Sequence, residues 1–228
     1  MTTLSLRFHD SAGAIERNVE IHKAIIAGWT GRDRAALEKH IKELEELGVA
    51  RPASTPIFYR VAASRFTSAP RIEVSGTDSS GEAEFALLKT DGMLWVGVGS
   101  DHTDRKVETY NVTVSKQMCD KPVCRDFWRF DDVAAHWDRL MLRSFAYERG
   151  ERRLYQEGMV TAMLPPLDLI ARYRETAEFA DGTLMFCGTL AAKGGIRPAE
   201  RLELQLEDPI LSRTITHFYD IVSLPVLG

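Results

Sequence analysis

Two apolar runs separated by Asp91-Gly92 are the feature that most constrains the fold of this chain. Residues 83–88 (AEFALL) and 94–99 (LWVGVG) have the composition of β-strands. An Asp-Gly pair between two such runs is typical of a tight two-residue β-turn. The sequence therefore predicts an antiparallel hairpin, and the turn fixes which residues of the two strands lie opposite each other.

Three carboxylates come together in the predicted hairpin. Glu82 pairs opposite Asp101, and Glu84 lies diagonally from Asp101 on the same face, because residues two apart on a strand project to the same side. Facing like charges destabilise a sheet, and a hard cation such as Mg²⁺, Mn²⁺ or Ca²⁺ would remove that cost. The three residues are therefore candidate metal ligands. The alternative interpretation is that they form the solvated face of an alternating strand.

Length and composition exclude several classes of protein. A chain of 228 residues, 44% hydrophobic and 27% charged, can bury a full core. Its formal net charge of −4, without a basic patch, gives no support for nucleic-acid binding. No apolar run reaches membrane-spanning length, and the first residues lack the features of a signal peptide. With three cysteines interpreted as reduced thiols, we expect a cytoplasmic protein that binds no membrane.

The pattern divides the chain into an N-terminal part, residues 1–55, and a main domain, residues 56–228. The N-terminal part has two expected strands, 4–9 and 15–22, followed by a helix that Asp33 caps and Gly48 ends. An apolar stripe at helical spacing supports this helix; it comprises Leu37, Ile41, Leu44 and Leu47. Prolines at 52 and 56 then mark a linker over residues 51–56.

The main domain is predicted to be mostly β. The expected strands are 57–61, 71–74, 82–88, 94–99, 140–147, 184–188, 201–207 and 212–222. A helix over 166–173 interrupts them, and long loops are expected at 100–126 and 189–200. The predicted fold class is mixed β (α+β), a β-sandwich roll with few helices.

Six segments, in chain order, resemble motifs of the fumarylacetoacetate hydrolase superfamily. They are 56–60 (PIFYR, similar to P-x-F-x-K), 81–85 (GEAEF, similar to E-x-E-L), 99–105 (GSDHTDR, similar to N-D-x-S-A-R-D), 115–122 (SKQMCDKP, similar to K-S-F-D-x-x-x-P), 155–163 (YQEGMVTAM, similar to Q-x-G-x-T followed by Met) and 181–189 (DGTLMFCGT, similar to G-D-x-I-x-x-G-T). The resemblance spans about residues 25–221 and implies the family's fold.

The resemblance also implies a metal centre and an assembly. Glu82, Glu84 and Asp101 would hold one divalent cation, usually Mg²⁺ or Mn²⁺, which agrees with the hairpin argument. The chain departs from the family where the stretch between the acidic strand and Asp101 is little more than a hairpin, and where Ser100 and Asp104 replace the usual Asn and Ala. These departures indicate a separate branch. Members of the family usually form homodimers, so the resemblance also implies a homodimer.

A His-x-x-Glu pair on the N-terminal helix is a candidate catalytic dyad. His40 and Glu43 are three residues apart, so Glu43 can orient the imidazole of His40. The alternative is a chance pair on a charged, solvated helix. The position resembles the lid dyad of the family's smaller acylpyruvate-cleaving members, and this resemblance favours catalysis with the helix acting as a lid.

Four further residues are candidates for the site: Lys116 for catalysis, and Arg105, Thr189 and Glu108 for binding the substrate. Lys116 is a candidate clamp for an enolate or carboxylate, or else a solvated loop lysine. Arg105 could pair with a substrate carboxylate through its bidentate fork, or with an acidic neighbour. Thr189 offers a hydroxyl and an N–H, or forms a plain turn. Glu108 stands where some members of the family have a substrate-contacting Gln.

The predicted function is a divalent-metal-dependent hydrolase that cleaves a C–C bond in a small 2-oxo acid or 1,3-diketo acid of the acylpyruvate kind. A divalent cation polarises the carbonyl, and His40, oriented by Glu43, takes a proton from the attacking water. Two alternatives remain open. One is a decarboxylase or tautomerase/isomerase that uses the same site. The other is a non-catalytic member of the fold that binds a small acid.

Overall fold

Two stacked β-sheets form the body of the protein. The computed structural model describes residues 1–46 and 51–227, apart from the side chains of residues 40, 43 and 44. The strands of the larger sheet, in spatial order, are β2 (Gly13–Ile21), β1 (Thr2–Asp10), β12 (Asp126–Arg129), β9 (Met93–Ser100), β8 (Ala83–Thr90), β15 (Thr183–Thr189), β3 (Lys23–Gly28) and β4 (Ile57–Val61). Those of the smaller sheet are β14 (Glu151–Met159), β13 (Met141–Glu148), β16 (Arg201–Asp208), β17 (Arg213–Leu224) and β6 (Arg71–Ser75).

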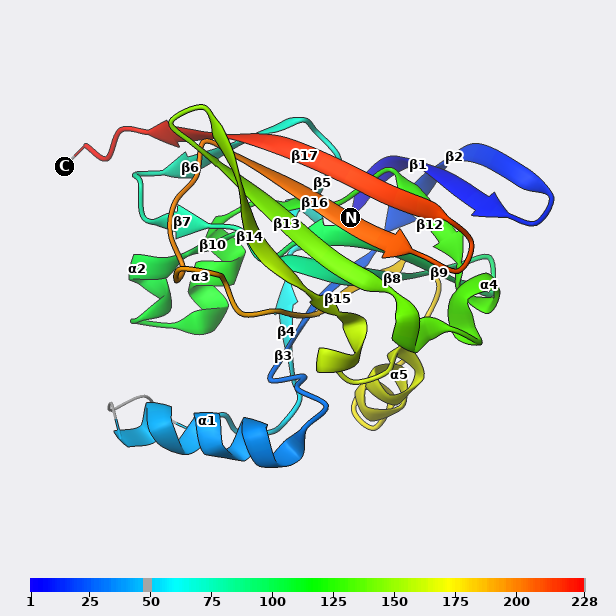
Figure 1. Ribbon diagram of the computed structural model, residues 1–228, viewed down its shortest axis with the longest axis horizontal. Helices are drawn as coiled ribbons and strands as arrows, with labels where there is room; N and C mark the ends of the chain where they lie inside the picture. The colour runs from blue at the N-terminus through cyan, green and yellow to red at the C-terminus, as the bar shows by residue number, and fades with distance from the viewer. Residues whose placement is uncertain (47–50, 228) are drawn as a thin grey trace.

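Short elements connect and flank the sheets. The short strands are β5 (Phe66–Thr67), β7 (Ser79–Ser80), β10 (Thr103–Asp104) and β11 (Lys121–Pro122). The α-helices are α1 (Arg34–Glu46), α2 (Arg105–Glu108), α3 (Val112–Met118), α4 (Phe130–Ala134) and α5 (Pro166–Arg174), and single 3-10 turns cover Ala63–Arg65, Trp137–Arg139 and Val160–Ala162. In Figure 1 the smaller sheet crosses in front of the larger one, and α1 stands apart from both sheets.

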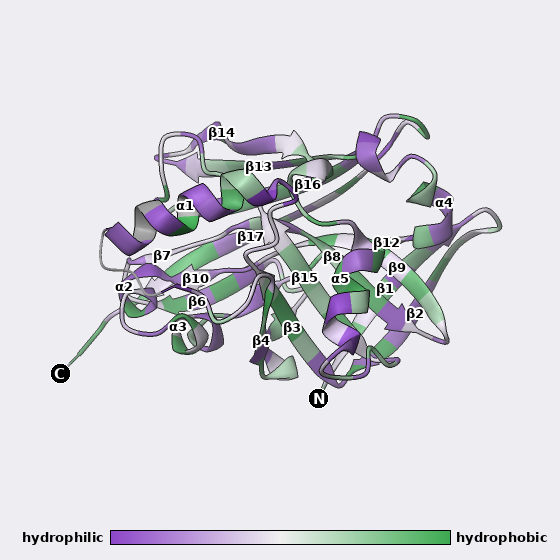
Figure 2. Cartoon of the chain, turned by 90° about the horizontal axis from the view of Figure 1, so that it is seen from below, coloured by the Kyte–Doolittle hydropathy of each residue, from purple (hydrophilic) through white to green (hydrophobic). Residues whose placement is uncertain are grey.

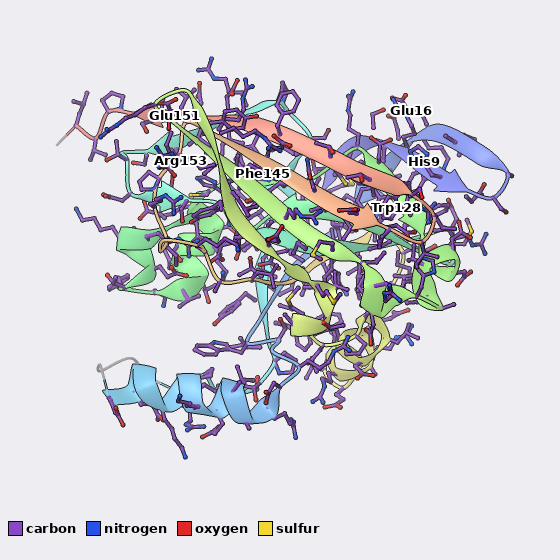
Figure 3. The ribbon with its side chains drawn as sticks, viewed as in Figure 1. His9, Glu16, Trp128, Phe145, Glu151 and Arg153 are labelled. Carbon is purple, nitrogen blue, oxygen red and sulfur yellow. The ribbon has the colours of Figure 1, made fainter. Side chains whose placement is uncertain are left out.

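Both sheets mix parallel and antiparallel pairs, as the predicted class requires. β1 runs parallel to β12, and the register places His9 beside Trp128 at one end of the larger sheet (Figure 3). β3 runs parallel to β15, and β6 runs parallel to β17, whereas the other neighbours in these two sheets are antiparallel. The prediction of a mixed β fold with few helices is confirmed.

The core lies between the two sheets. The alternation of Leu202, Leu204 and Leu206 in β16 points three buried side chains inward, each at most 1% exposed. Strand β8 contributes Phe85 and Leu87 from the larger sheet, both fully buried. Burial of these apolar side chains is the main force that holds the two sheets together.

Three strands of these sheets were missing from the prediction, namely β3, β12 and β14, and β12 is only four residues long. β3 reads KAIIAG and is buried in the larger sheet, so it lacks the alternation that marks a half-exposed strand. Figure 2 shows β3 as a largely hydrophobic strand. β14 reads ERRLYQEGM, a polar sequence that forms the edge of the smaller sheet, with Glu151 and Arg153 on it (Figure 3). Propensity alone favours neither β3 nor β14 as a strand.

The region from 100 to 126 is not the long loop that was predicted. It contains β10, α2, α3 and β11. Asp104 caps α2 by accepting a hydrogen bond from the Val107 N–H, and Asn111 caps α3 by accepting one from the Val114 N–H. Capping by Asp and Asn satisfies backbone donors that would otherwise lack a partner. These short helices bring Lys116 and Arg105 to the end of the β8–β9 hairpin.

The N-terminal strands share the larger sheet with the main domain. β3 hydrogen-bonds to β4 on one side and to β15 on the other, so strands from both sides of the expected boundary between residues 55 and 56 belong to this sheet. Between β3 and β4 the chain forms α1, which Asp33 caps by accepting hydrogen bonds from Ala35 N and Ala36 N at 2.9 and 3.0 Å. The expected end of this helix at Gly48 lies outside the described residues. Among the helices that the structure describes, none is both long and apolar enough to cross a membrane.

Candidate metal centre

The β8–β9 hairpin has the predicted turn and register. Thr90 pairs with Met93, so Asp91 and Gly92 form a two-residue turn in which both have positive φ, 51° and 71°. These angles are typical of the turn that matches the twist of a hairpin. At the other end of the hairpin, Asp101 N donates to Glu82 O at 3.0 Å, which places these two residues opposite each other.

Glu82, Glu84 and Asp101 converge as predicted. Each offers one carboxylate oxygen, and these three atoms lie within 4.8 Å of one another. Glu84 and Asp101 are buried, and the side chain of Glu82 is 18% exposed. Three hard oxygen donors at this spacing fit a divalent cation such as Mg²⁺, Mn²⁺ or Ca²⁺.

The electrostatics of Glu84 support that fit. Its pKa is raised well above its ordinary value, first by burial and then by the negative charges of Asp101 and Glu82. Burial likewise raises the pKa of Glu82. A cation held by these oxygens would offset both costs, since an adjacent opposite charge favours the ionised carboxylate.

The backbone of β15 completes the pocket around Glu84. Gly188 N donates a hydrogen bond to Glu84 Oε2, at a point where the pairing of β15 with β8 is irregular. Gly188 has a φ of +99°, and a Cβ built there would lie 1.8 Å from Thr30 Oγ1. Glycine is therefore required at this position by both its backbone angle and its surroundings.

Two lysines contact Asp101. Lys116 donates to Asp101 Oδ2 from the last turn of α3, so it is a buried ion-pair partner and not a solvated loop lysine. Lys121 Nζ lies 2.9 Å from Asp101 Oδ1. Burial alone would raise the pKa of Asp101, but the two ammonium groups hold it well below its ordinary value. Sequence reasoning missed Lys121, although it lies in the 115–122 segment, directly before Pro122.

Arg105 and Glu108 lie beside the carboxylates at the edge of a cleft. Arg105 Nη2 is 3.1 Å from Glu82 Oε1, and Arg105 Nη1 is 2.9 Å from Glu108 Oε2. Its Nε donates to Ser80 Oγ at 2.7 Å. The cleft has a volume of about 510 Å³ and is lined by Asp78, Ser79, Ser80, Arg105, Lys106, Glu108, Ile196, Arg197 and Pro198. Arg105 thus links the cleft to one of the candidate metal ligands.

Thr189 has its hydroxyl engaged within the protein. Thr189 Oγ1 donates to Ala83 O at 2.8 Å and accepts from Gln156 Nε2 at 2.7 Å. Gln156, which is 1% exposed, also accepts from Ala83 N at 2.9 Å and from Ser144 Oγ at 2.8 Å. These bonds fix Ala83, the residue between Glu82 and Glu84, so Thr189 and Gln156 hold the strand that carries two of the candidate ligands in place.

His102 is buried next to Asp101 and is held by two hydroxyl groups. Its ring nitrogens lie 3.0 Å from Tyr219 Oη and 2.9 Å from Ser79 Oγ. Burial, together with the charge of Lys121, lowers its pKa to about 3, so the ring is neutral. With both ring nitrogens engaged, His102 contributes no ligand atom to the acidic cluster.

The proposed dyad lies on α1. The backbone of His40 and Glu43 belongs to this helix, but their side chains lie outside the described residues. In Figures 1 and 2 α1 lies at the same end of the long axis as α2 and α3, and Figure 2 shows α1 towards β13 and β14 and the two short helices towards β6 and β7. This is also the end from which Lys116 and Arg105 reach the carboxylates. The catalytic role of the dyad stays a prediction.

Several solved structures share the fold of this chain, among them one of a fumarylacetoacetate hydrolase family protein. Yeast ynq8, described as a fumarylacetoacetate hydrolase family protein, matches with a TM-score of 0.64 and 14% identity over 91% of this chain and 95% of that chain. The structure of Cg1458 matches with a TM-score of 0.64 and 13% identity over 93% and 81%. A 2-keto-3-deoxy-D-arabinonate dehydratase complexed with magnesium and 2,5-dioxopentanoate matches with a TM-score of 0.63 and 13% identity over 96% and 79%. The chain therefore has this fold, as the sequence motifs predicted.

The chain also matches a defined sequence family. Residues 27–219 match the family described as protein of unknown function DUF2848, and the chain belongs to it. No curated protein is significantly similar to it in sequence. Membership of this family agrees with the departures from the superfamily motifs noted above.

Proposed function

We propose that the protein is a divalent-metal-dependent enzyme that acts on a small 2-oxo acid or 1,3-diketo acid. The observation that carries the proposal is the convergence of Glu82, Glu84 and Asp101 within 4.8 Å at the end of one hairpin. Arg105, which contacts Glu82, also lines the adjacent cleft. A bound divalent cation would supply Lewis acidity, which polarises the carbonyl oxygen of such a substrate.

The protein's own side chains supply the rest of the site. The Lys116 ammonium, which donates to Asp101, would stabilise the negative charge that develops on an enolate oxygen. Arg105 would bind a substrate carboxylate from the cleft wall by exchanging its bond to Glu108. Thr189 and Gln156 act indirectly. They hold Ala83 in place by hydrogen bonds, and Ala83 lies between Glu82 and Glu84.

The reaction we propose first is hydrolysis of a C–C bond. His40, oriented by Glu43, takes a proton from water as the water oxygen attacks the distal carbonyl carbon. The C–C bond then breaks, its electron pair goes to the enolate of the 2-oxo acid, and a proton on carbon completes that product. The other product is a carboxylic acid. The support for this reaction is the position of the dyad on α1, at the same end of the long axis as α3, the helix that carries Lys116.

The second candidate is dehydration of a 3-deoxy-2-oxo acid. The observation that favours it is the dehydratase of the same fold, whose structure contains magnesium and 2,5-dioxopentanoate. In this reaction a proton leaves C3 and hydroxide leaves the neighbouring carbon, so water is released and no C–C bond breaks. The same enolate-stabilising role of Lys116 serves both reactions.

A substrate screen tests the proposal. Purified protein with Mg²⁺ or Mn²⁺ is incubated with acylpyruvates, 1,3-diketo acids and 3-deoxy-2-oxo acids, and the products are identified by NMR. We expect turnover that Glu84→Gln abolishes, and a hydrolase also loses activity in His40→Ala. His22→Ala is the control, because His22 is an exposed histidine between β2 and β3, 3.7 Å from Glu20.

The products identified in the screen distinguish the candidate functions. A cleaved acid supports hydrolysis, and an oxo acid that has lost one water without C–C cleavage supports dehydration. Release of CO₂ or an isomer alone would replace both with decarboxylation or tautomerisation. Binding of an oxo acid without turnover, in a protein that is insensitive to His40→Ala, would contradict enzymatic function and indicate a small-acid-binding protein.

A further inference from the structure

Lys121 is a fully buried cation behind the candidate metal centre. It lies in β11, which pairs in parallel with β5, and none of its side chain is exposed. Its ammonium lies 2.9 Å from Asp101 Oδ1 and also donates a hydrogen bond to the backbone carbonyl of His102. The strand pairing and the carbonyl together fix this charge against one oxygen of Asp101.

Lys116 contacts the other oxygen of Asp101 but has different surroundings. Lys116 donates to Asp101 Oδ2 from α3, and its ammonium lies over the ring of Tyr59, 5.6 Å from the ring centroid. The Lys116 side chain is 8% exposed, whereas that of Lys121 is completely buried. The two ammonium groups therefore contact different oxygens of Asp101, and Lys121 is the more deeply enclosed of the two.

We propose that Lys121 is a positioning residue, a counter-ion whose ion pair with Asp101 Oδ1 leaves Asp101 with one oxygen, not two, to offer to a divalent cation. This inference rests on the metal centre proposed above. Outer partners of metal-binding carboxylates commonly fix their orientation in this way. Lys116, whose side chain is 8% exposed, is then the ammonium that can turn to a substrate.

Two measurable consequences follow from a fixed positive charge at this position. Without a bound ion, Lys121 helps to compensate the charge of Asp101, whose side chain is completely buried. When a divalent cation is bound, the Lys121 ammonium repels that cation across a few ångströms and lowers the affinity of the protein for it. Lys121 thus keeps the metal-free protein folded and keeps the bound cation exchangeable.

Calorimetric titration of the metal-free protein with Mg²⁺ tests the inference. Lys121→Met removes the charge and keeps the length of the side chain, and we expect the Kd for Mg²⁺ to fall about tenfold. Lys121→Arg keeps the charge and should stay within about twofold of the wild type, by the same estimate. Lys89→Met, at the other end of β8, is the control for removing a lysine and should leave the Kd unchanged.

The outcomes separate this inference from the proposed function. Unchanged or weaker Mg²⁺ binding by folded Lys121→Met overturns the counter-ion role while leaving the metal centre intact. A wild-type protein that binds neither Mg²⁺ nor Mn²⁺ overturns the metal centre, and the inference with it. If Lys121→Met does not fold, the double variant with Asp101→Asn is measured. Recovery of the folded state supports the pairing, and continued unfolding rejects it.

Discussion

The backbone N–H of Gly188 donates a hydrogen bond to Glu84 Oε2, so an irregularity in β15 places a donor on a buried carboxylate of the neighbouring strand. A carboxylate that is buried between two others needs such a partner. The contact depends on a glycine, because its φ of +99° and the 1.8 Å approach of Thr30 Oγ1 exclude a Cβ. The strand that holds the candidate metal ligands is therefore shaped by its neighbour in the sheet.

Replacement of Gly188 tests this relationship. Gly188→Ala adds a Cβ against Thr30 at a strained backbone angle, so we expect the free energy of unfolding to fall by about 3 kcal/mol. Gly150→Ala is the matched control, because Gly150 also has positive φ, +77°, but no atom lies within 4 Å of its Cβ position. Urea unfolding of both variants measures the difference. Equal losses would show that the close approach to Thr30 is not rigid.

Neutralising Glu84 separates metal binding from stability. Glu84→Gln removes one of three mutually repelling buried charges, so without metal we expect stability to rise by about 1 kcal/mol. The same change removes a ligand, so the increase in Tm on adding Mg²⁺ should disappear. Glu73→Gln, an exposed carboxylate 2.9 Å from Arg71, is the control and should keep the Mg²⁺ response. A full Mg²⁺ response in Glu84→Gln would contradict the metal centre.

Gln156 is expected to be a structural requirement of the site. It makes four hydrogen bonds, including those to Ala83 N at 2.9 Å and Leu190 O at 2.6 Å. Gln156→Leu leaves these buried groups without partners, so we expect the free energy of unfolding to fall by about 3 kcal/mol. Gln205→Leu, on the half-buried face of β16, should cost far less. Thermal melts compare the two, and a wild-type Tm for Gln156→Leu would refute the role.

The stability of the protein should depend on pH through His217. Burial, reinforced by the positive charge of Arg125, lowers the pKa of His217 to about 4. In the unfolded chain its pKa is about 6.5. Between these values the unfolded chain binds a proton that the folded protein does not, so stability falls as the pH drops from 6.5 to 4.

A histidine variant isolates this contribution. We expect His217→Gln to reduce the loss of unfolding free energy between pH 7 and pH 4.5 by about 2 kcal/mol, a value discounted for partial exposure. His22→Gln removes an exposed histidine, with 53% of its side chain accessible, and should leave the pH dependence as in the wild type. Denaturant titrations between pH 7 and pH 4.5 measure the free energy of unfolding of each variant. Parallel curves for wild type and His217→Gln would contradict the assignment.

The sequence by itself determined the local features of the site. Asp91-Gly92 fixes a two-residue turn, and strand alternation then sets Glu82 and Asp101 opposite each other, since both effects act over a few residues. The cap of α1 at Asp33 is local for the same reason. The order of the six weak motifs along the chain also indicated the fold. Each motif marks one segment, and the segments together follow the order of one known superfamily.

Only the tertiary structure decided what surrounds that hairpin. β3 and β14 are strands because of their neighbours in the sheets, and their own sequences show no half-buried alternation. Lys121 becomes a partner of Asp101 through the pairing of β11 with β5, two segments more than fifty residues apart in the chain. Such contacts depend on long-range packing and buried charge, neither of which leaves a periodic pattern in the sequence.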